Sequence, residues 1–524
     1  MVGNGRKIIT TTYKEVTRDN VIPIIQAAMP FYRQNAADCD FLINFDAGVQ
    51  PLVRENEKKV MPWINCEAVD NVAHTITDFW IGYIFGNPIT LVQRGDGDKS
   101  ELKAQGIKNL NNYYAATGSE RDQQTIASYI AKCGHCFTLA EINSDWEIGD
   151  SYFTREVLDP RCAFVVRSTA YQDRRVILGV SLFQDDENNY VITACSKDEL
   201  YQIYARKIPN PVKAGVEKYD EWKNGYEWTH LELSGELNPM RRVCITEWYW
   251  NIDRMGAFEN QISALNNLNL LVSDISNGFE QNIQAIWWSN NVDFPTKIVK
   301  DAEGHEIEVP VKPKNGEWLD TSSAKDGGNP SIQPLTIDYH LGEMQKSYIE
   351  QRDLALERAH VPNRNDISGG SSGVAMDSAS GWADAETVAS SRIAVIKACL
   401  IDEIKVILAV LRESSDIDVD NPVLSLVFSD IEASIGHPKN SDLATRTNAI
   451  ATLIKHGFAL EDVLTCIPLF SDPTQVIERS GEGVRAYQDA NVYAKSESAD
   501  EAVNADRSMS DLSDQYSESA IMNV

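Results

Sequence analysis

A long apolar stripe at helical spacing constrains the fold of this chain more than any other feature. Apolar side chains recur every three or four residues from Ile262 to Ile286, which predicts one helix of about 25 residues, roughly 37 Å long. The same spacing predicts helices over about 339–359 and about 385–413. With 524 residues, the chain is long enough for several domains or for one elongated subunit of an assembly.

A compact insert separates the first two of these helices. The runs 296–299 and 307–311 read as the strands of a hairpin that turns around 301–304. Trp318 and a loose stretch rich in serine, glycine and asparagine follow the hairpin. We therefore expect a small β element between two long helices.

The parts before and after this core differ in periodicity. The chain to about residue 140 is predicted to be mainly helical, with one helix from Val69 to a stop at Gly86-Asn87-Pro88 and another over about 120–131. From about 137 to 250, β-branched and aromatic runs between turn residues predict a mostly antiparallel β region. The expected fold class is α+β.

Near the end of the chain the pattern becomes helical once more and then loses its apolar residues. Ser441 or Asp442 can cap a helix that ends near His456-Gly457, with two shorter helices after it. From Ser496 onward, serine, aspartate and glutamate dominate, so residues 496–524 are expected to be a disordered acidic tail.

The overall charge is strongly acidic. Lys+Arg 48 against Asp+Glu 77 gives a formal net charge of −29, the opposite of a module that grips nucleic acid by its phosphates. The balance does not exclude a surface past which DNA slides. No apolar run reaches 18 residues, and the start lacks the apolar core of a signal peptide, so we expect no membrane span. Nine scattered cysteines favour a reducing, intracellular compartment.

The stretch NDISGGSSGVAMDSASG, residues 365–381, raises the question of a phosphate-binding loop. A Walker loop needs a lysine directly after glycine and a strand before the loop. Here no Lys or Arg occurs between Arg364 and Arg392, and a helix is expected in place of the strand. We therefore reject nucleotide binding at 365–381. The turn at 95–100 is rejected as well, because Asp98 occupies the glycine position before Lys99.

Cys133-Gly-His-Cys136 resembles the motif of thiol–disulfide oxidoreductases. Such motifs follow a strand and begin a helix, whose N-terminus lowers the thiol pKa. Here the helix comes first and the strand second, which favours a structural corner. No second CxxC supplies four zinc ligands, and the histidines show neither HExxH nor paired ligand spacing. No catalytic residue, metal site or cofactor is predicted.

Lysines gather in the insert against this acidic background. Two interpretations fit the cluster. It is either an ordinary solvated hairpin or, in an oligomer, part of a ring of basic residues that contacts a phosphate backbone without base-specific contacts. Its members are Lys297, Lys300, Lys312, Lys314 and Lys325.

The order of these segments resembles the portal proteins of tailed bacteriophages, the siphovirus-type portal family. Six stretches in family order carry the resemblance, over roughly residues 60 to 480. They are NVAHTITDFWIGYIFGNPITL, VLDPRCAFVVR, NIDRMGAFENQISALNNLNLLVSDISNGFEQ, GEWLD, HVPNRNDISGGSSGVAMDSASG and FSDPTQVIERSGE.

This resemblance implies a ring, twelve-fold in the family, at one capsid vertex, through which double-stranded DNA is packaged and ejected. The implied parts are a wing (1–256), a first stem helix (257–286), a clip with a hairpin (287–336), a second stem helix (337–358), a tunnel loop (359–383), a long wing helix with its following segment (384–435) and a helical crown (436–495). No enzymatic activity or cofactor is implied.

The implied partners are terminase, then the head–tail connector, together with the major capsid and scaffolding proteins. The subunit would be assembled in the host cytoplasm and reside in the virion. Contacts to DNA would come from the clip lysines Lys297, Lys300, Lys312 and Lys314 and from the tunnel-loop residues Asn365, Asp366, Ser368, Gly369, Gly370, Ser371, Ser372 and Gly373.

Two other functions are alternatives to that of a portal protein. One is a thiol oxidoreductase that uses Cys133 and Cys136, and the other is a different phage head–tail structural protein such as an adaptor. Adaptors are generally much shorter than 524 residues, so length disfavours the second.

Overall fold

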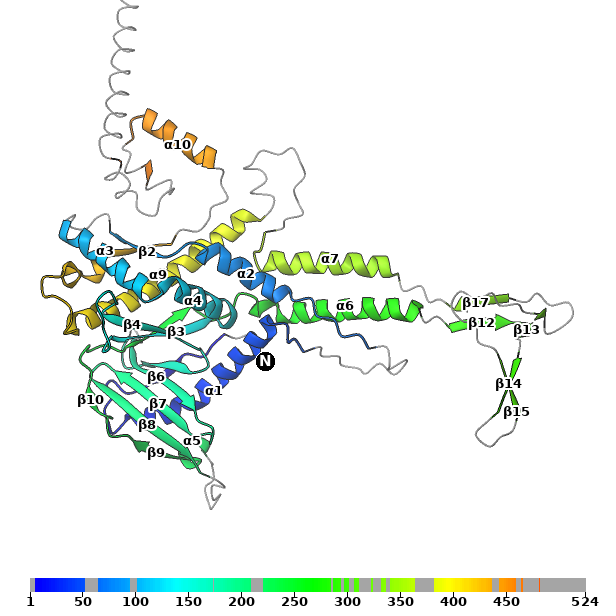
Figure 1. Ribbon diagram of the computed structural model, residues 1–524, viewed down its shortest axis with the longest axis horizontal. Coiled ribbons are helices and arrows are strands. Elements are labelled where there is room, and N and C mark those ends of the chain that lie inside the picture. Colours follow the sequence, from blue (N-terminus) through cyan, green and yellow to red (C-terminus); the bar gives the residue numbers. More distant parts are fainter. Residues whose placement is uncertain are drawn as a thin grey trace, which may run out of the picture. The chain divides into compact units, whose positions relative to one another are not determined.

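The computed structural model describes residues 5–51, 65–94, 101–172, 174–208, 220–283, 286–293, 296–300, 306–310, 322–323, 331–335, 340–362, 381–435, 443–458, 463–464 and 480 (Figure 1). The fold is mixed α+β, as expected. Two compact units share the chain. The first consists of Met1–Leu42, Thr77–Ala257 and Arg364–Val524, and the second of Ile43–Ile76 and Phe258–Asn363.

A seven-stranded sheet forms the largest core of the first unit. Its order is β1-β5-β6-β7-β8-β10, with β9 also paired to β8, and only β1 and β5 run parallel. The strands are β1 (Ile9–Thr11), β5 (Ala163–Ser168), β6 (Val176–Gln184), β7 (Tyr190–Ser196), β8 (Glu199–Lys207), β9 (Tyr226–His230) and β10 (Glu236–Leu237). Helix α1 (Val21–Asp46) covers one face, where Ile25 and Met29 pack among residues such as Val180 and Ile192 (Figure 1). Alternate strand residues supply this apolar face.

A second, three-stranded sheet lies against the other face. Its order is β11-β3-β4, formed by β3 (His135–Ile142), β4 (Phe153–Leu158) and β11 (Ile245–Tyr249). Phe137 and Ile245 of this sheet pack with Ala163 and Val165 of β5. The β region is therefore two packed layers. Its mostly antiparallel pairing is as the sequence predicted.

Helices complete the first unit. They are α2 (Val72–Phe85), which belongs to this unit from Thr77 onward, α3 (Glu101–Ala116), α4 (Ser119–Cys133), the short α5 (Glu221–Asn224), the 32-residue α9 (Trp382–Glu413) and α10 (Leu443–Lys455). The strands β2 (Thr90–Gln93) and β18 (Ile431–Ser434) pair antiparallel. Helix α9 packs on β3 and β11.

The second unit is built on two helices. Figure 1 shows α6 (Ile262–Ile283) and α7 (Leu341–Arg358) side by side. Three two-stranded ladders lie between them in the sequence. They are β12 (Ile286–Asn290) with β17 (Ser331–Leu335), β13 (Val292–Asp293) with β16 (Ser322–Ser323), and β14 (Thr296–Lys300) with β15 (Glu306–Pro310).

Most expected elements are confirmed, and a few boundaries were wrong. Ile286 begins strand β12, so the first long helix does not include it. Val69 precedes α2 in extended chain. The first 140 residues are mainly helical but contain β1 and β2. The helix expected to end near His456-Gly457 is seen as α10, whereas its expected caps Ser441 and Asp442 and the tail lie outside the described residues.

Glu247 of β11 gives this fold a specific response to acid. Its carboxylate is buried and accepts hydrogen bonds from Arg167 at 2.7 Å and from the Arg254 Nη2 at 3.0 Å. Burial raises the pKa of Glu247, but the two arginines outweigh burial and bring it from 4.5 to about 2. Stability from this group is therefore full above about pH 4.5 and is lost as the pH falls to about 2, a contribution on the order of 3 kcal/mol.

We predict that Glu247→Gln removes this contribution. The variant should have a lower urea midpoint than the wild type at neutral pH, and the difference should shrink as the pH falls from about 4.5 to 2. Glu227→Gln, on the exposed side of β9, is the matched control and should follow the wild type. A deficit in Glu247→Gln that stays constant over this pH range would contradict the assignment.

Candidate functional site

An extended strap, residues 65–71, lies along α6 in the second unit. Asn277 accepts from the Cys66 amide at 2.6 Å, Ser273 from the Ala68 amide at 3.0 Å, and Asn269 from the Asp70 amide at 2.9 Å. Ser273 also donates to the Ala68 carbonyl at 3.2 Å. All three α6 side chains are buried. The strap is therefore held on α6 by its backbone.

The spacing of these contacts explains why they fit. Four residues of helix rise about 6.0 Å, and two residues of extended chain rise about 6.6 Å. The strap runs antiparallel to α6, and the two spacings match closely. Residues 269, 273 and 277 of the helix therefore lie beside residues 70, 68 and 66 of the strap, respectively. An uncharged polar residue at every fourth position within an apolar helix is a signal in the sequence that we did not use.

The strap also contacts α7 through one carboxylate. Asp70 accepts a hydrogen bond from the Tyr348 hydroxyl and lies 3.5 Å from Arg352 Nε. Partial burial, and then the hydrogen bond to Asp70, raises the pKa of Tyr348 to about 12. Because Asn269 holds the Asp70 amide, a single residue of the strap joins both helices.

Amide side chains tie the end of α1 into the same arrangement. Asn269 donates to Gln50, and Gln50 donates to Asn71 at 2.8 Å and to the Phe45 carbonyl at 2.9 Å. Phe45 stacks on Phe258 at 5.7 Å between ring centroids. The base of the helix pair is thus a polar network beside one aromatic contact.

The lysines of the hairpin do not share one face. Lys297 lies opposite Val309 and Lys300 opposite Glu306 in the β14–β15 register. Since neighbouring strand residues alternate, side chains three positions apart point to opposite faces. Both lysines are exposed. Lys312 and Lys314 lie outside the described residues.

The predicted tunnel-loop residues, Asn365, Asp366, Ser368, Gly369, Gly370, Ser371, Ser372 and Gly373, also lie outside the described residues. Both flanking helix ends are described. Helix α7 ends at Arg358, and Gly381 caps the start of α9 with a φ of 82°. This left-handed backbone is where glycine avoids the strain of a Cβ.

Cys133-Gly-His-Cys136 forms a buried corner. Cys133 ends α4 and Cys136 lies on β3, and burial raises the pKa of both thiols. Gly134 has a φ of 81°, and a Cβ there would lie 2.1 Å from the Arg254 carbonyl oxygen. The corner therefore serves packing. Nothing in its geometry favours a thiol oxidoreductase, because the thiols lie at a helix C-terminus and away from solvent.

The described part of the chain contains neither a candidate metal site nor a candidate membrane-spanning helix. Its His, Cys, Asp and Glu side chains form no group of three suited to a metal ion. Its helices include none with the length and apolar character to cross a membrane.

Comparison with known families identifies a match over most of the chain. Residues 54–488 match the family model described as phage portal protein, SPP1 Gp6-like. The matched range includes the strap, both helices of the second unit and the hairpin. No curated protein matches the chain significantly.

We predict that Asn269→Ala releases the strap from α6. The substitution leaves the Asp70 amide without its acceptor, at a cost of about 1–3 kcal/mol for a buried polar group. Hydrogen–deuterium exchange of the peptide that spans 65–71 should become faster. Asn267→Ala, at an exposed position of the same helix, is the control and should leave exchange unchanged. Equal exchange in both variants would show that the ladder does not hold the strap.

Proposed function

The chain belongs to the family of phage portal proteins, SPP1 Gp6-like, and on that premise we propose how its elements divide the work of the portal ring. A portal protein is a capsid component of the virion and forms an oligomeric ring through which the phage genome is packaged and ejected. The family is structural, so the energy for DNA movement would come from a separate ATPase, the terminase. We assign the ring twelve subunits.

In this proposal α6 and α7 are the stem helices. The strap supports the assignment, because Asn269, Ser273, Asn277 and Asp70 fix the pair by contacts within one subunit. Stem helices must keep their geometry while a duplex moves past them. This polar ladder is the observation that carries the proposal.

The other assignments follow the chain order. Residues 287–336 form the clip that meets terminase and then the head–tail connector, and 359–383 form the tunnel loop. Residues 1–256 and 384–435 form the wing, which meets the major capsid and scaffolding proteins, and 436–495 form the crown. The subunit is assembled in the host cytoplasm before it enters the capsid.

Charge supports a conduit that guides DNA without gripping it. At a net charge of −29, an acidic wall releases few counterions from DNA and so gains little binding free energy. Lys297, Lys300, Lys312 and Lys314 of the clip would touch phosphates without reading sequence. Residues 365–373 of the tunnel loop are mostly small and include no basic residue, so they would lie beside the duplex without holding it.

We predict that deletion of Ser368–Gly373 separates assembly from packaging. Negative-stain microscopy of the purified variant should show rings with a central hole, as for the wild type, whereas the amount of DNA packaged per particle should fall at least tenfold. Deletion of six residues in the acidic tail, 510–515, is a length-matched control that should package normally. If the wild-type protein were a compact monomer, the proposal of a portal ring would be wrong. If only the 368–373 variant failed to form rings, the loop would be required for assembly and not for packaging alone.

A further inference from the structure

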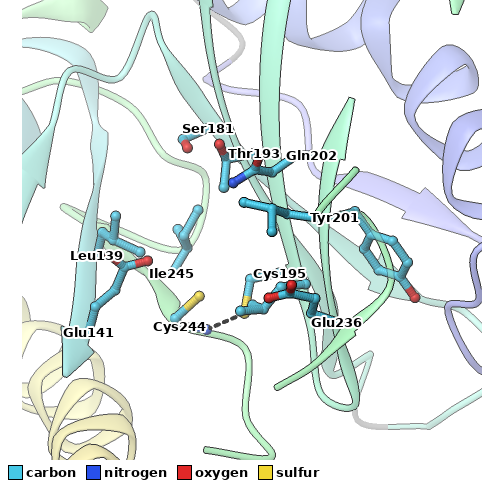
Figure 2. Close-up of a pocket in the computed structure, with 12 residues that line it drawn as sticks. Leu139, Glu141, Ser181, Thr193, Cys195, Tyr201, Gln202, Glu236, Cys244 and Ile245 are labelled. Carbon is cyan, nitrogen blue, oxygen red and sulfur yellow. Dashed lines mark hydrogen bonds between the residues drawn. The ribbon is translucent and has the colours of Figure 1, made fainter. Parts of the chain in front are cut away.

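A cavity of about 140 Å³ lies between the two sheets of the first unit (Figure 2). Strands β6, β7 and β8 supply one wall, with Ser181, Thr193 and Gln202, and strands β3 and β11 supply the other, with Leu139 and Ile245. The volume corresponds to about four or five water molecules. The portal assignments above make no use of this cavity.

Two cysteines line the cavity together. Cys195 is on β7 and Cys244 directly precedes β11, and each is 2% exposed. The backbone N–H of Cys244 donates to the Cys195 sulfur at 3.1 Å, the contact dashed in Figure 2. The fold thus brings together two thiols that lie 49 positions apart in the sequence.

The surroundings distinguish the two thiols. The Cys195 sulfur accepts a second N–H, from the Asn238 side chain at 3.4 Å, and its S–H can donate to the Ser196 and Arg242 carbonyls at 3.5 and 3.6 Å. The neighbouring Cys195 and then burial raise the pKa of Cys244 well above 9.0. Because this raised pKa disfavours the Cys244 thiolate, Cys195 is placed to attack first, and Cys244 lies beside it as the thiol that can act second.

Carboxylates give the cavity an acidic entrance. Glu141 of β3 and Glu236 of β10 line it, and both residues are exposed to solvent. Neither carboxylate makes a hydrogen bond or ion pair within the described residues. Glu156 lies close enough to Glu141 to help raise its pKa, after partial burial. A cation at this entrance would relieve that repulsion, whereas an anion would add to it.

We propose that Cys195 and Cys244 form a site for thiol–disulfide exchange with small cationic disulfides, and that the reaction ends in a disulfide joining β7 to the segment before β11. The Cys195 thiolate attacks one sulfur of the small disulfide, forms a mixed disulfide and expels one thiolate. The Cys244 sulfur, after losing its proton to solvent, then attacks the Cys195 sulfur and expels the second thiolate. The protein pair is oxidised by two electrons, and one small disulfide is reduced to two thiols.

A second pair of cysteines in the same unit provides an internal comparison. Cys133 donates its S–H to the Cys39 carbonyl at 3.8 Å, and the hydrogen bond between the two thiols lowers the pKa of Cys39. Both residues are 0% exposed and neither lines the cavity. If access of the small disulfide to the sulfur governs reactivity, Cys39 should stay reduced although its pKa is lowered.

The test is exposure of the full-length native protein to cystamine, a small dicationic disulfide. Remaining thiols are alkylated after denaturation, and peptides are identified by mass spectrometry. We expect a Cys195–Cys244 cross-linked peptide, with Cys39 and Cys133 recovered as alkylated thiols. In Cys244→Ser, cysteamine should remain attached to Cys195. Absence of the cross-link in the wild type, or equal oxidation of Cys39 and Cys133, would overturn the proposal.

Charge selectivity tests the role of the entrance. Dithiodiglycolate, an anionic disulfide of similar size, should form the cross-link more slowly than cystamine, on the order of fivefold. The double variant Glu141→Gln, Glu236→Gln should bring the two rates within about twofold of each other, while Glu227→Gln should keep the difference. Equal rates for both reagents in the wild type would remove the cationic preference from the proposal.

Discussion

The buried ion pair between Arg155 and Glu403 holds the first unit together. Arg155 of β4 donates to Glu403 of α9 at 3.0 and 3.3 Å, and their side chains are 2% and 1% exposed. Asp122 of α4 lies 3.5 Å from the same guanidinium. Burial alone would lower the pKa of Arg155, but the nearby carboxylates raise it. Removal of one partner from such a pair leaves an uncompensated buried charge, at a cost of about 3–5 kcal/mol. The pair also joins distant parts of the chain, because the segment Phe258–Asn363 of the second unit lies between its two residues in the sequence.

The two units are stabilised by different kinds of contact. The first buries many apolar side chains between α1 and a seven-stranded sheet, so its polar contacts add specificity to an existing core. Among the described residues, the two long helices and short ladders of the second unit bury fewer apolar side chains. There Asn269, Ser273 and Asn277 satisfy the strap backbone inside the structure, where an apolar stripe would leave amide and carbonyl groups unpaired. A helix pair with a thin core gains its fixed geometry from hydrogen bonds.

The sequence predicted elements well and contacts poorly, for a physical reason. Helices α6, α7 and α9 show a regular apolar period, and the β14–β15 hairpin shows alternation around a turn, so local pattern identifies them. Helix α1 lies within the part predicted to be mainly helical, but its bounds were not predicted; Pro30 inside it removes a helical hydrogen bond, and packing on the sheet offsets that loss. The strap on α6 and the Cys195–Cys244 pair join residues far apart in the chain. No local period carries such information, whereas Cys133 and Cys136, which look reactive in sequence, are buried by the fold.

The net charge of the folded subunit bears on the proposed passage of DNA. Residues 496–524 carry seven carboxylates and one arginine, a net charge of −6, which leaves −23 for residues 1–495. Acidity is thus a property of the folded subunit and not only of its tail. Several arginines that could have met phosphate are engaged inside the first unit, since Arg155, Arg167 and Arg254 pair with buried carboxylates. The charges of these arginines are balanced by carboxylates of the same unit. In the proposed portal ring, an acidic wall would release few counterions from DNA, so a duplex would pass without being trapped.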